Sequence, residues 1–136
     1  MKKIYSKIDS SLLLHQVSTL EDAKASRTDL ADPKEFLQVS ALNLKKGTIV
    51  NPHAHVARAG EKNVTVQEGW ILLRGKAKCI FFDINNAPIG EEVLGPGDCS
   101  ITFYGGHSLT ILDEDTFFYE IKTGPYKGKE QDNKPI

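Results

Sequence analysis

Short runs of apolar residues, separated by turn residues, fill the chain from residue 36 onward. Gly, Asn, Asp and Pro gather at the ends of these runs, as is typical of turns between strands. The runs are shorter than typical helices, and turns follow one another closely, so the pattern predicts an all-β fold. The predicted strands cover residues 36–44, 63–73, 76–82, 101–104, 107–112 and 116–122.

The first 35 residues follow a different pattern. The sequence STLE at residues 18–21 has the form of a capping box and predicts a short helix over about residues 20–27. We therefore expect an N-terminal extension with this short helix at residues 1–35 and a single domain at residues 36–126. The polar segment at residues 127–136 is expected to be a mobile tail.

The predicted strand at residues 63–73 is apolar on both faces. Because successive side chains of a strand point to opposite faces, Ile71 and Leu73 face outward if Trp70 and Leu72 face the interior. An exposed apolar face needs cover. A second copy in a homodimer or the N-terminal segment could provide it, and the sequence does not decide between them.

Composition favours one domain that binds a small molecule. A chain of 136 residues with 40% hydrophobic content can bury a single core. The net charge of −1, from 17 basic and 18 acidic residues, offers no basic field for nucleic acid or an anionic membrane. The apolar run at residues 12–14 is too short for a secretory signal, no later run reaches membrane-spanning length, and the two cysteines suit reduced thiols. We therefore expect a cytoplasmic protein with a small-molecule ligand.

Three of the four histidines and one glutamate form the clearest chemical pattern. His53 and His55 are two residues apart, so both imidazoles leave the same face of an extended strand. Glu68 and His107, on neighbouring strands, would complete a four-ligand site for one ion. Imidazole and carboxylate together suit a divalent transition metal such as Fe, Mn, Ni, Co or Zn, and the spacing does not choose among these metals. A His-x-His pair alone can also simply face solvent, so the argument depends on all four residues together.

These residues resemble the two motifs of the cupin superfamily. The first motif combines a Gly, a His-x-His pair, a Glu and a closing Gly, and the second carries a His after a Pro-Gly-Asp turn. The resemblance spans about residues 36–124 and implies a cupin-type antiparallel β-barrel, also called a double-stranded β-helix or jelly roll, with the metal near one mouth. It also implies that His53, His55, Glu68 and His107 are the metal ligands. The first motif falls on Gly47, His53, His55, Glu68 and Gly75, and the second falls on Pro96, Gly97, Asp98 and His107.

The chain departs from these motifs at two places. The segment 56–67 between the His pair and Glu68 is longer than is usual in the family, and we expect it to form a loop over the mouth. Within it, Glu61 lies nearer the usual spacing and competes with Glu68 for the carboxylate role, but it lacks the following step to Gly75. The second motif also lacks its usual Pro, Gly and Asn, and the chain has Thr102, Tyr104 and Ile111 there.

Strand alternation predicts what would surround the ion. If Glu68 points inward, Trp70 does so too, and Leu109 follows His107 in the same way. Trp70 and Leu109 are therefore pocket candidates, although core packing is the simpler role for Leu109.

Four protein ligands leave one or two coordination positions for water, dioxygen or a bidentate substrate. Lewis-acid chemistry favours an isomerase or epimerase acting on a small oxygenated or sugar-like substrate, and that reaction needs a positioned base. Tyr104 and Glu61 are the main candidates for the base, and Lys62 and Glu120 are further ones. An Fe(II)-dependent dioxygenase and a non-catalytic metal- and sugar-binding module linked to polysaccharide metabolism stay open as alternatives.

The end of the cupin-like region carries a narrower resemblance. Residues 118–126, with the sequence FYEIKTGPY, are similar to the end of small single-domain cupin metalloproteins of the WbuC type. Such proteins are found with bacterial surface-polysaccharide genes. The resemblance implies a role in sugar-related metabolism without naming a reaction.

Overall fold

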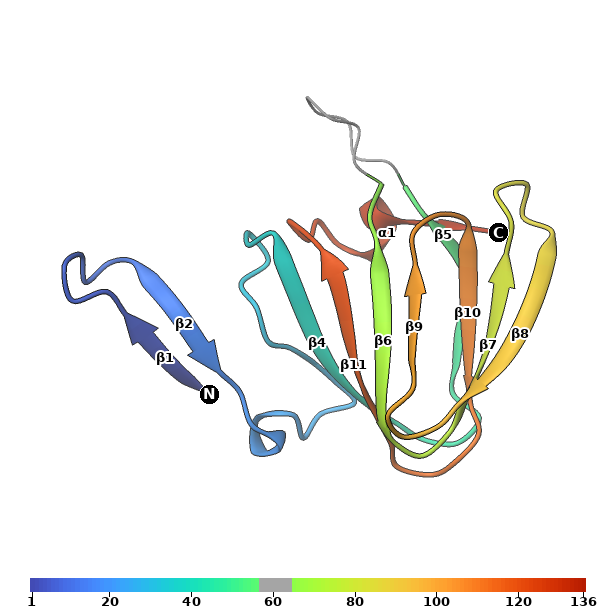
Figure 1. The fold of residues 1–136 in the computed structure, drawn as a ribbon, viewed down its shortest axis with the longest axis horizontal. Helices are drawn as coiled ribbons and strands as arrows, with labels where there is room; N and C mark the ends of the chain where they lie inside the picture. The colour runs from blue at the N-terminus through green and yellow to red at the C-terminus, as the bar shows by residue number, and fades with distance from the viewer. Residues whose placement is uncertain (57–64) are drawn as a thin grey trace.

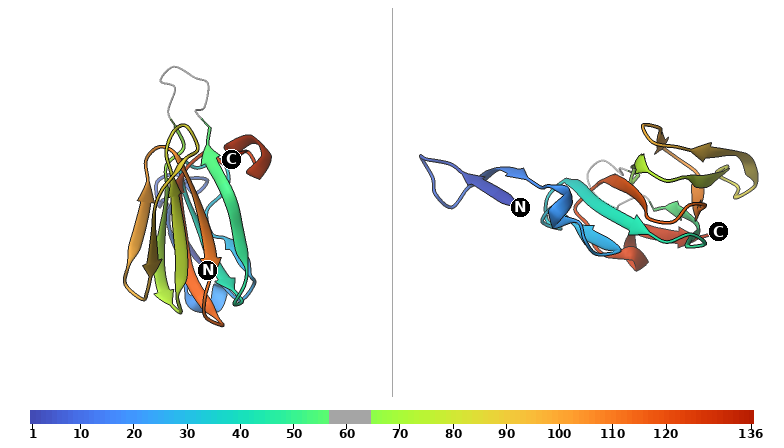
Figure 2. Two further views of the ribbon diagram at one scale, coloured as in Figure 1. Left: turned by 90° about the vertical axis from the view of Figure 1, so that its right-hand side faces the viewer. Right: turned by 90° about the horizontal axis from the view of Figure 1, so that it is seen from below.

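Two antiparallel sheets of five strands each face one another and hold the core between them (Figures 1 and 2). The computed structural model describes residues 1–56 and 65–136. The first sheet has the order β3 (Arg27–Asp29), β4 (Leu37–Leu44), β11 (Thr116–Thr123), β6 (Glu68–Arg74), β9 (Cys99–Thr102). The second has the order β12 (Asn133–Pro135), β5 (Ile49–His55), β10 (Gly106–Ile111), β7 (Ala77–Phe82), β8 (Pro88–Leu94).

From β4 onward the chain alternates between the two sheets, apart from the β7–β8 hairpin, which stays in the second sheet. This alternation is that of a jelly roll, and all of the strand pairs in the described part of the chain are antiparallel. The all-β prediction is confirmed. The predicted closed barrel is not: within residues 1–56 and 65–136 no strand ladder joins one sheet to the other.

The core between the sheets confirms the predicted alternation along β6. Trp70 and Leu72 are buried, whereas Ile71 on the opposite face is half-buried and Leu73 is 44% exposed. Both sheets contribute side chains to this core, because each presents one apolar face to the other. The buried cluster consists of Leu42, Trp70, Leu72, Ala77, Cys79, Leu94, Leu109, Ile111 and Phe118.

Most of the predicted strands coincide with observed ones, but the bounds of two of them differ and several observed strands were not predicted. Among the described residues, the strand predicted at 63–73 begins only at Glu68, and the strand predicted at 101–104 lies two residues earlier, at β9. Strand β8 was not predicted. All of its residues except Leu94 are exposed, so the alternation that reveals a half-buried strand is absent from its sequence.

The predicted helix at residues 20–27 is wrong. The structure has only a 3₁₀ turn at Leu20–Asp22, in which the Asp22 carboxylate accepts a hydrogen bond from the backbone N–H of Thr19 at 2.8 Å. None of the residues of this turn is buried, and Arg27 instead begins β3 and pairs with β4. The described residues contain no helix that is long and apolar enough to cross a membrane.

Both ends of the chain carry structure of their own. Strands β1 (Lys2–Tyr5) and β2 (Leu13–Val17) form a hairpin that extends away from the two sheets (Figure 1). At the other end, α1 (Lys129–Asp132) leads into β12, which pairs with β5. The segment 127–136 thus adds a strand beside His53 and His55, and its mobility stays a prediction.

Candidate metal centre

Strand pairing brings the four predicted ligands together from both sheets. In the second sheet β10 lies beside β5, and His107 is the direct cross-strand partner of His53. His55 follows two residues later on β5 and points to the same side. Glu68 comes from the opposite sheet, at the start of β6. The cluster therefore lies between the sheets, at the end of the core.

The distances within this cluster suit a single ion. The Nε2 atoms of His53 and His107 lie 3.2 Å apart, and Nε2 of His107 lies 3.3 Å from Oε1 of Glu68. Nε2 of His55 lies 3.7 Å from Oε2 of Glu68, and one ligand atom from each of the four residues lies within 4.8 Å of the others. Two atoms bound at about 2.1 Å and at a right angle around an ion are about 3 Å apart, so the four side chains fit a metal.

Unpaired polar atoms in the cluster support the same conclusion. Glu68 is 4% exposed, His107 is 1% exposed and the His55 side chain is 2% exposed. Within the described part of the chain, Nδ1 and Nε2 of His55 and Oε1 of Glu68 have no hydrogen-bond partner. Leaving a buried polar atom unpaired costs about 1–3 kcal/mol. A divalent ion would give a partner to Nε2 of His55 and to Oε1 of Glu68.

Two of the histidines are oriented through their other ring nitrogen. Nδ1 of His53 lies 2.8 Å from the backbone oxygen of Asn51, and Nδ1 of His107 lies 2.7 Å from Oγ1 of Thr102. A proton on each Nδ1 leaves the Nε2 lone pair for a metal, which is the arrangement typical of metal-binding histidines. Thr102 was noted in the sequence only as a departure from the second motif, yet it supports a candidate ligand.

Burial also sets the ionisation of the cluster. Loss of hydration lowers the pKa of His55 and of His107 to about 4 and lowers the pKa of His53 as well, so the imidazoles are neutral at pH 7. Burial, together with the negative charge of Glu120, raises the pKa of Glu68 to about 7. A bound cation would oppose that rise, because it favours the carboxylate form.

Trp70 and Leu109 occupy different places relative to the cluster. The Trp70 ring stacks on the His107 ring, with centroids 4.2 Å apart and an interplanar angle of 25°. Its Nε1 atom is buried and has no hydrogen-bond partner among the described residues. Leu109 is 1% exposed and belongs to the apolar core. Trp70 is thus a direct neighbour of the cluster, whereas Leu109 contributes to the floor below it.

The inner face of the first sheet is polar beside the cluster. Cross-strand pairing places Lys122 opposite Glu68, and Glu120 opposite Trp70. The interior becomes apolar only in the following row, where Phe118 pairs with Leu72. Lys122 was not predicted as a site residue. The sequence could have predicted its position through the alternation along β11, because Lys122 and Glu120 share a face with the buried Phe118. The two polar inner rows consist of Gln38, Lys122, Glu68 and Thr102, and of Ser40, Glu120, Trp70 and Ser100.

A glycine allows β10 to approach β5 closely enough for His107 to reach His53. A Cβ atom added at Gly106 would lie 2.9 Å from the backbone oxygen of His53 and 2.5 Å from Cδ1 of Ile136. Contacts this short do not occur with real side chains, so any larger residue would displace the strand or the C-terminus.

Of the two proposed catalytic residues, the structure describes only Tyr104, which is not part of the cluster. Tyr104 is 72% exposed and lies in the loop between β9 and β10, where it borders a surface cavity with Phe82 and Ile89. Glu61, Lys62 and the loop expected over the mouth lie outside the described residues. Of the two glutamates considered as ligands, Glu68 is the one that the structure places with the histidines.

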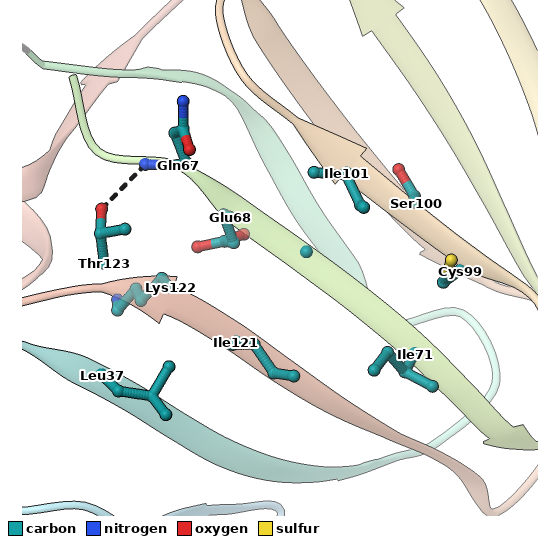
Figure 3. A pocket seen from close by; sticks show the side chains of 11 residues that line it. Leu37, Gln67, Glu68, Ile71, Cys99, Ser100, Ile101, Ile121, Lys122 and Thr123 are labelled. Atoms are coloured by element: carbon teal, nitrogen blue, oxygen red, sulfur yellow. Dashed lines mark hydrogen bonds between the residues drawn. The ribbon is translucent and has the colours of Figure 1, made fainter.

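The outer face of the first sheet carries an apolar groove (Figure 3). Its cavity volume is about 270 Å³. It is lined by β4, β6, β9 and β11, of which β6 also carries Glu68, but the side chains that give it its apolar character point away from the interior. These side chains are Leu37, Ile71, Ile101 and Ile121.

Solved structures with the same fold are found, although no protein-family profile and no curated protein sequence matches the chain. KdgF from Halomonas sp. is 16% identical, with a TM-score of 0.56 over 71% of this chain and 77% of KdgF. Oxalate decarboxylase from Bacillus subtilis is 21% identical, with a TM-score of 0.59 over 76% of this chain and 24% of that protein. CapF in complex with 3-isopropenyl-tropolone is 18% identical, with a TM-score of 0.65 over 81% of this chain and 31% of CapF.

These similar structures have the cupin fold, and the chain shares that fold. Independently of them, its four-residue cluster could hold a metal ion. The chain spans about a quarter of the length of oxalate decarboxylase and about a third of CapF. Oxalate decarboxylase from B. subtilis contains Mn(II) centres.

Proposed function

We propose that this protein binds one divalent transition metal through His53, His55, Glu68 and His107 and acts as a metal-dependent isomerase or epimerase on a small oxygenated or sugar-like substrate. The observation that carries the proposal is the convergence of three neutral, buried imidazoles and one buried carboxylate from both sheets. The Mn(II) centres of oxalate decarboxylase support a metal such as Mn, and Fe, Ni, Co and Zn suit the same ligands.

The chain's own residues have separate tasks in this proposal. The bound ion would supply Lewis-acid polarisation of a substrate oxygen. The backbone oxygen of Asn51 holds the His53 imidazole in position, and Oγ1 of Thr102 holds that of His107. The Trp70 ring stacks on the His107 ring and shields it from water. A base must also be positioned, and Tyr104, Glu61 and Glu120 are the candidates. Of the candidates that the structure describes, Tyr104 and Glu120, it is Glu120 that lies on the polar inner face beside the cluster.

A role in polysaccharide metabolism belongs to this proposal because of the resemblance of residues 118–126 to WbuC-type proteins. A cytoplasmic location belongs to it as well, supported by the two free thiols of Cys79 and Cys99. Oxygenase chemistry and a non-catalytic sugar-binding role make different predictions. Dioxygen consumption by the Fe(II)-loaded protein would favour the first, and sugar binding without turnover would favour the second.

The first experiment is metal analysis of untagged protein, purified without chelator and reconstituted with Mn(II), Fe(II) or Zn(II). We expect about one ion per chain, by elemental analysis, and loss of that ion in the His55→Ala variant with the β-rich circular dichroism spectrum retained. His15→Ala removes the histidine outside the cluster and should keep the metal. Undiminished metal content in the His55→Ala variant would contradict the proposal.

A further inference from the structure

Lys122 lies beside the metal cluster in a position that a purely apolar interior would not contain. It is the direct cross-strand partner of Glu68, and both side chains are on the inner face of the first sheet. Directly opposite residues of neighbouring strands have Cβ atoms about 4.5–5.5 Å apart, so the Lys122 stem begins next to a candidate ligand. Lys122 is only 7% exposed, and a lysine is seldom buried this far without a partner.

The contacts of the Lys122 ammonium group leave hydrogen-bonding capacity. Among the described residues, it lies 3.8 Å from Oε1 of Glu120 and 3.9 Å from the centroid of the Tyr126 ring. The same Glu120 oxygen already accepts a hydrogen bond from Nη2 of Arg27 at 3.0 Å. An ammonium group has three N–H donors, and a distance of 3.8 Å is too long for a direct hydrogen bond. Arg27 thus holds Glu120 in place while Lys122 stays able to bind a further oxygen.

A metal-loaded cluster would favour an anionic group beside Lys122. Arg27 pairs with Asp29 and Glu120, and Asp132 is a further buried carboxyl group near Tyr126. A divalent ion at the cluster and the Lys122 ammonium group would both attract a carboxylate placed between them.

Trp70 offers a second donor in the next row of the same face. Its buried Nε1–H has no partner among the described residues, and its ring stacks on His107. We propose that the ligand of this site is a small organic acid, such as a 2-oxo acid or a sugar acid, whose carboxylate is bound by Lys122. Its remaining oxygen atoms face the metal cluster and Trp70. This inference rests on the proposed function, because it places the ligand against the metal-loaded cluster.

Calorimetry with a matched pair of probes tests this inference. Pyruvate and hydroxyacetone have similar size and the same ketone, but only pyruvate carries a carboxylate. We expect the Zn(II)-loaded protein to bind pyruvate, and the Lys122→Met variant to bind it at least about tenfold more weakly at unchanged metal content. Binding of hydroxyacetone should change little. The Lys122→Arg variant should retain pyruvate binding, and Lys46→Met, at an exposed lysine, is the matched control.

Three results would overturn the assignment of Lys122. They are wild-type protein that holds metal but does not bind pyruvate, a Lys122→Met variant with unchanged affinity, and equal losses for both probes. If Lys122→Met fails to hold the metal, the test uses the wild-type protein at low and high salt. The affinity for pyruvate should then fall with salt while the affinity for hydroxyacetone does not, and equal salt dependence of the two affinities would overturn the inference. Failure of the wild-type protein to bind metal would instead contradict the proposed function.

Discussion

Glu68 is the one residue of the cluster that comes from the first sheet, and it makes contact with two histidines of the second. We expect Glu68→Gln to weaken metal binding by more than about 100-fold, because the amide keeps the shape but removes the charge that an ion needs. Titration with Zn(II), followed by calorimetry, measures this change. Glu61→Gln, at the competing glutamate, should leave the affinity within about twofold. A larger loss in Glu61→Gln than in Glu68→Gln would reverse the choice of carboxylate ligand.

Residue spacing predicted the four-residue cluster, because the period of a strand fixes which side chains share a face. The two-residue period of a strand was enough to predict that His53 and His55 share a face. Glu68 was preferred to Glu61 as the carboxylate ligand because of its spacing from Gly75. The hydrogen bond between His107 and Thr102 could not be predicted in this way. It depends on the turn between β9 and β10, which brings two residues of different strands together. Lys122 was not considered as a site residue, although the strand period gives it the same face as Phe118.

At the scale of elements, the contact between β10 and β5 depends on Gly106. We expect Gly106→Ala to lower the free energy of unfolding by about 1–3 kcal/mol, because the added methyl group collides with the His53 carbonyl oxygen and with Ile136. Gly90→Ala is the matched control, since a Cβ atom at that strand position meets nothing within 4 Å. Urea denaturation of both variants measures the difference. Equal stability of the two variants would show that β10 can shift without cost.

The elements that sequence analysis predicted correctly are those with a buried face. Strands β4, β7, β10 and β11 each carry several buried residues, and buried residues alternate with partly exposed ones along parts of β7 and β11, which leaves a readable pattern. Strand β8 at the edge of its sheet leaves none, and the 18–21 capping pattern led to a single turn rather than a helix. The reason lies in the tertiary structure: residues from Arg27 onward gain a strand partner in β4, which local sequence does not reveal.

At the scale of the whole molecule, two apolar surfaces are exposed on the same chain. One is the outer groove of the first sheet (Figure 3), and the other is the β1–β2 hairpin, whose Ile4, Tyr5, Leu13 and Leu14 are 38–50% exposed. A two-stranded hairpin is marginally stable alone. The groove continues toward the base of this hairpin, where Gln16 and Ser18 border a second cavity with Leu37 and Ile121. We therefore predict a homodimer in which the sheet faces meet and each hairpin covers the partner.

The substitution Ile101→Asp tests this dimer. Ile101 is 59% exposed within the groove on edge strand β9, so a charge there should favour the monomer. Ile89→Asp places the same change at a 65% exposed isoleucine on edge strand β8 of the other sheet and should leave the dimer intact. Light scattering after size exclusion gives the mass of each variant. A monomeric wild-type protein, or identical behaviour of the two variants, would contradict the predicted interface.

The sequence predicted that the outer face of β6 needs cover, but it left two candidates. The structure shows that Ala23 and Leu30 of the N-terminal segment pack against Ala41 of β4 and Phe117 of β11, which belong to the same sheet as β6. The part around Ile71 and Ile121 stays open. The N-terminal segment therefore leaves the outer groove of the first sheet open, and its cover by a second copy in a homodimer stays a prediction.

The division of the cluster between the sheets has a mechanical meaning. Three ligands belong to one sheet and the fourth to the other, and among the described residues no strand ladder joins the sheets. A bound ion would cross-link the two sheets, which are otherwise held together mainly by the packing of their side chains. Its binding energy would then add directly to the cohesion of the fold, by about 2.7 kcal/mol at a free metal concentration of 100 times the dissociation constant. The melting temperature of this protein would thus rise with the concentration of free metal around it.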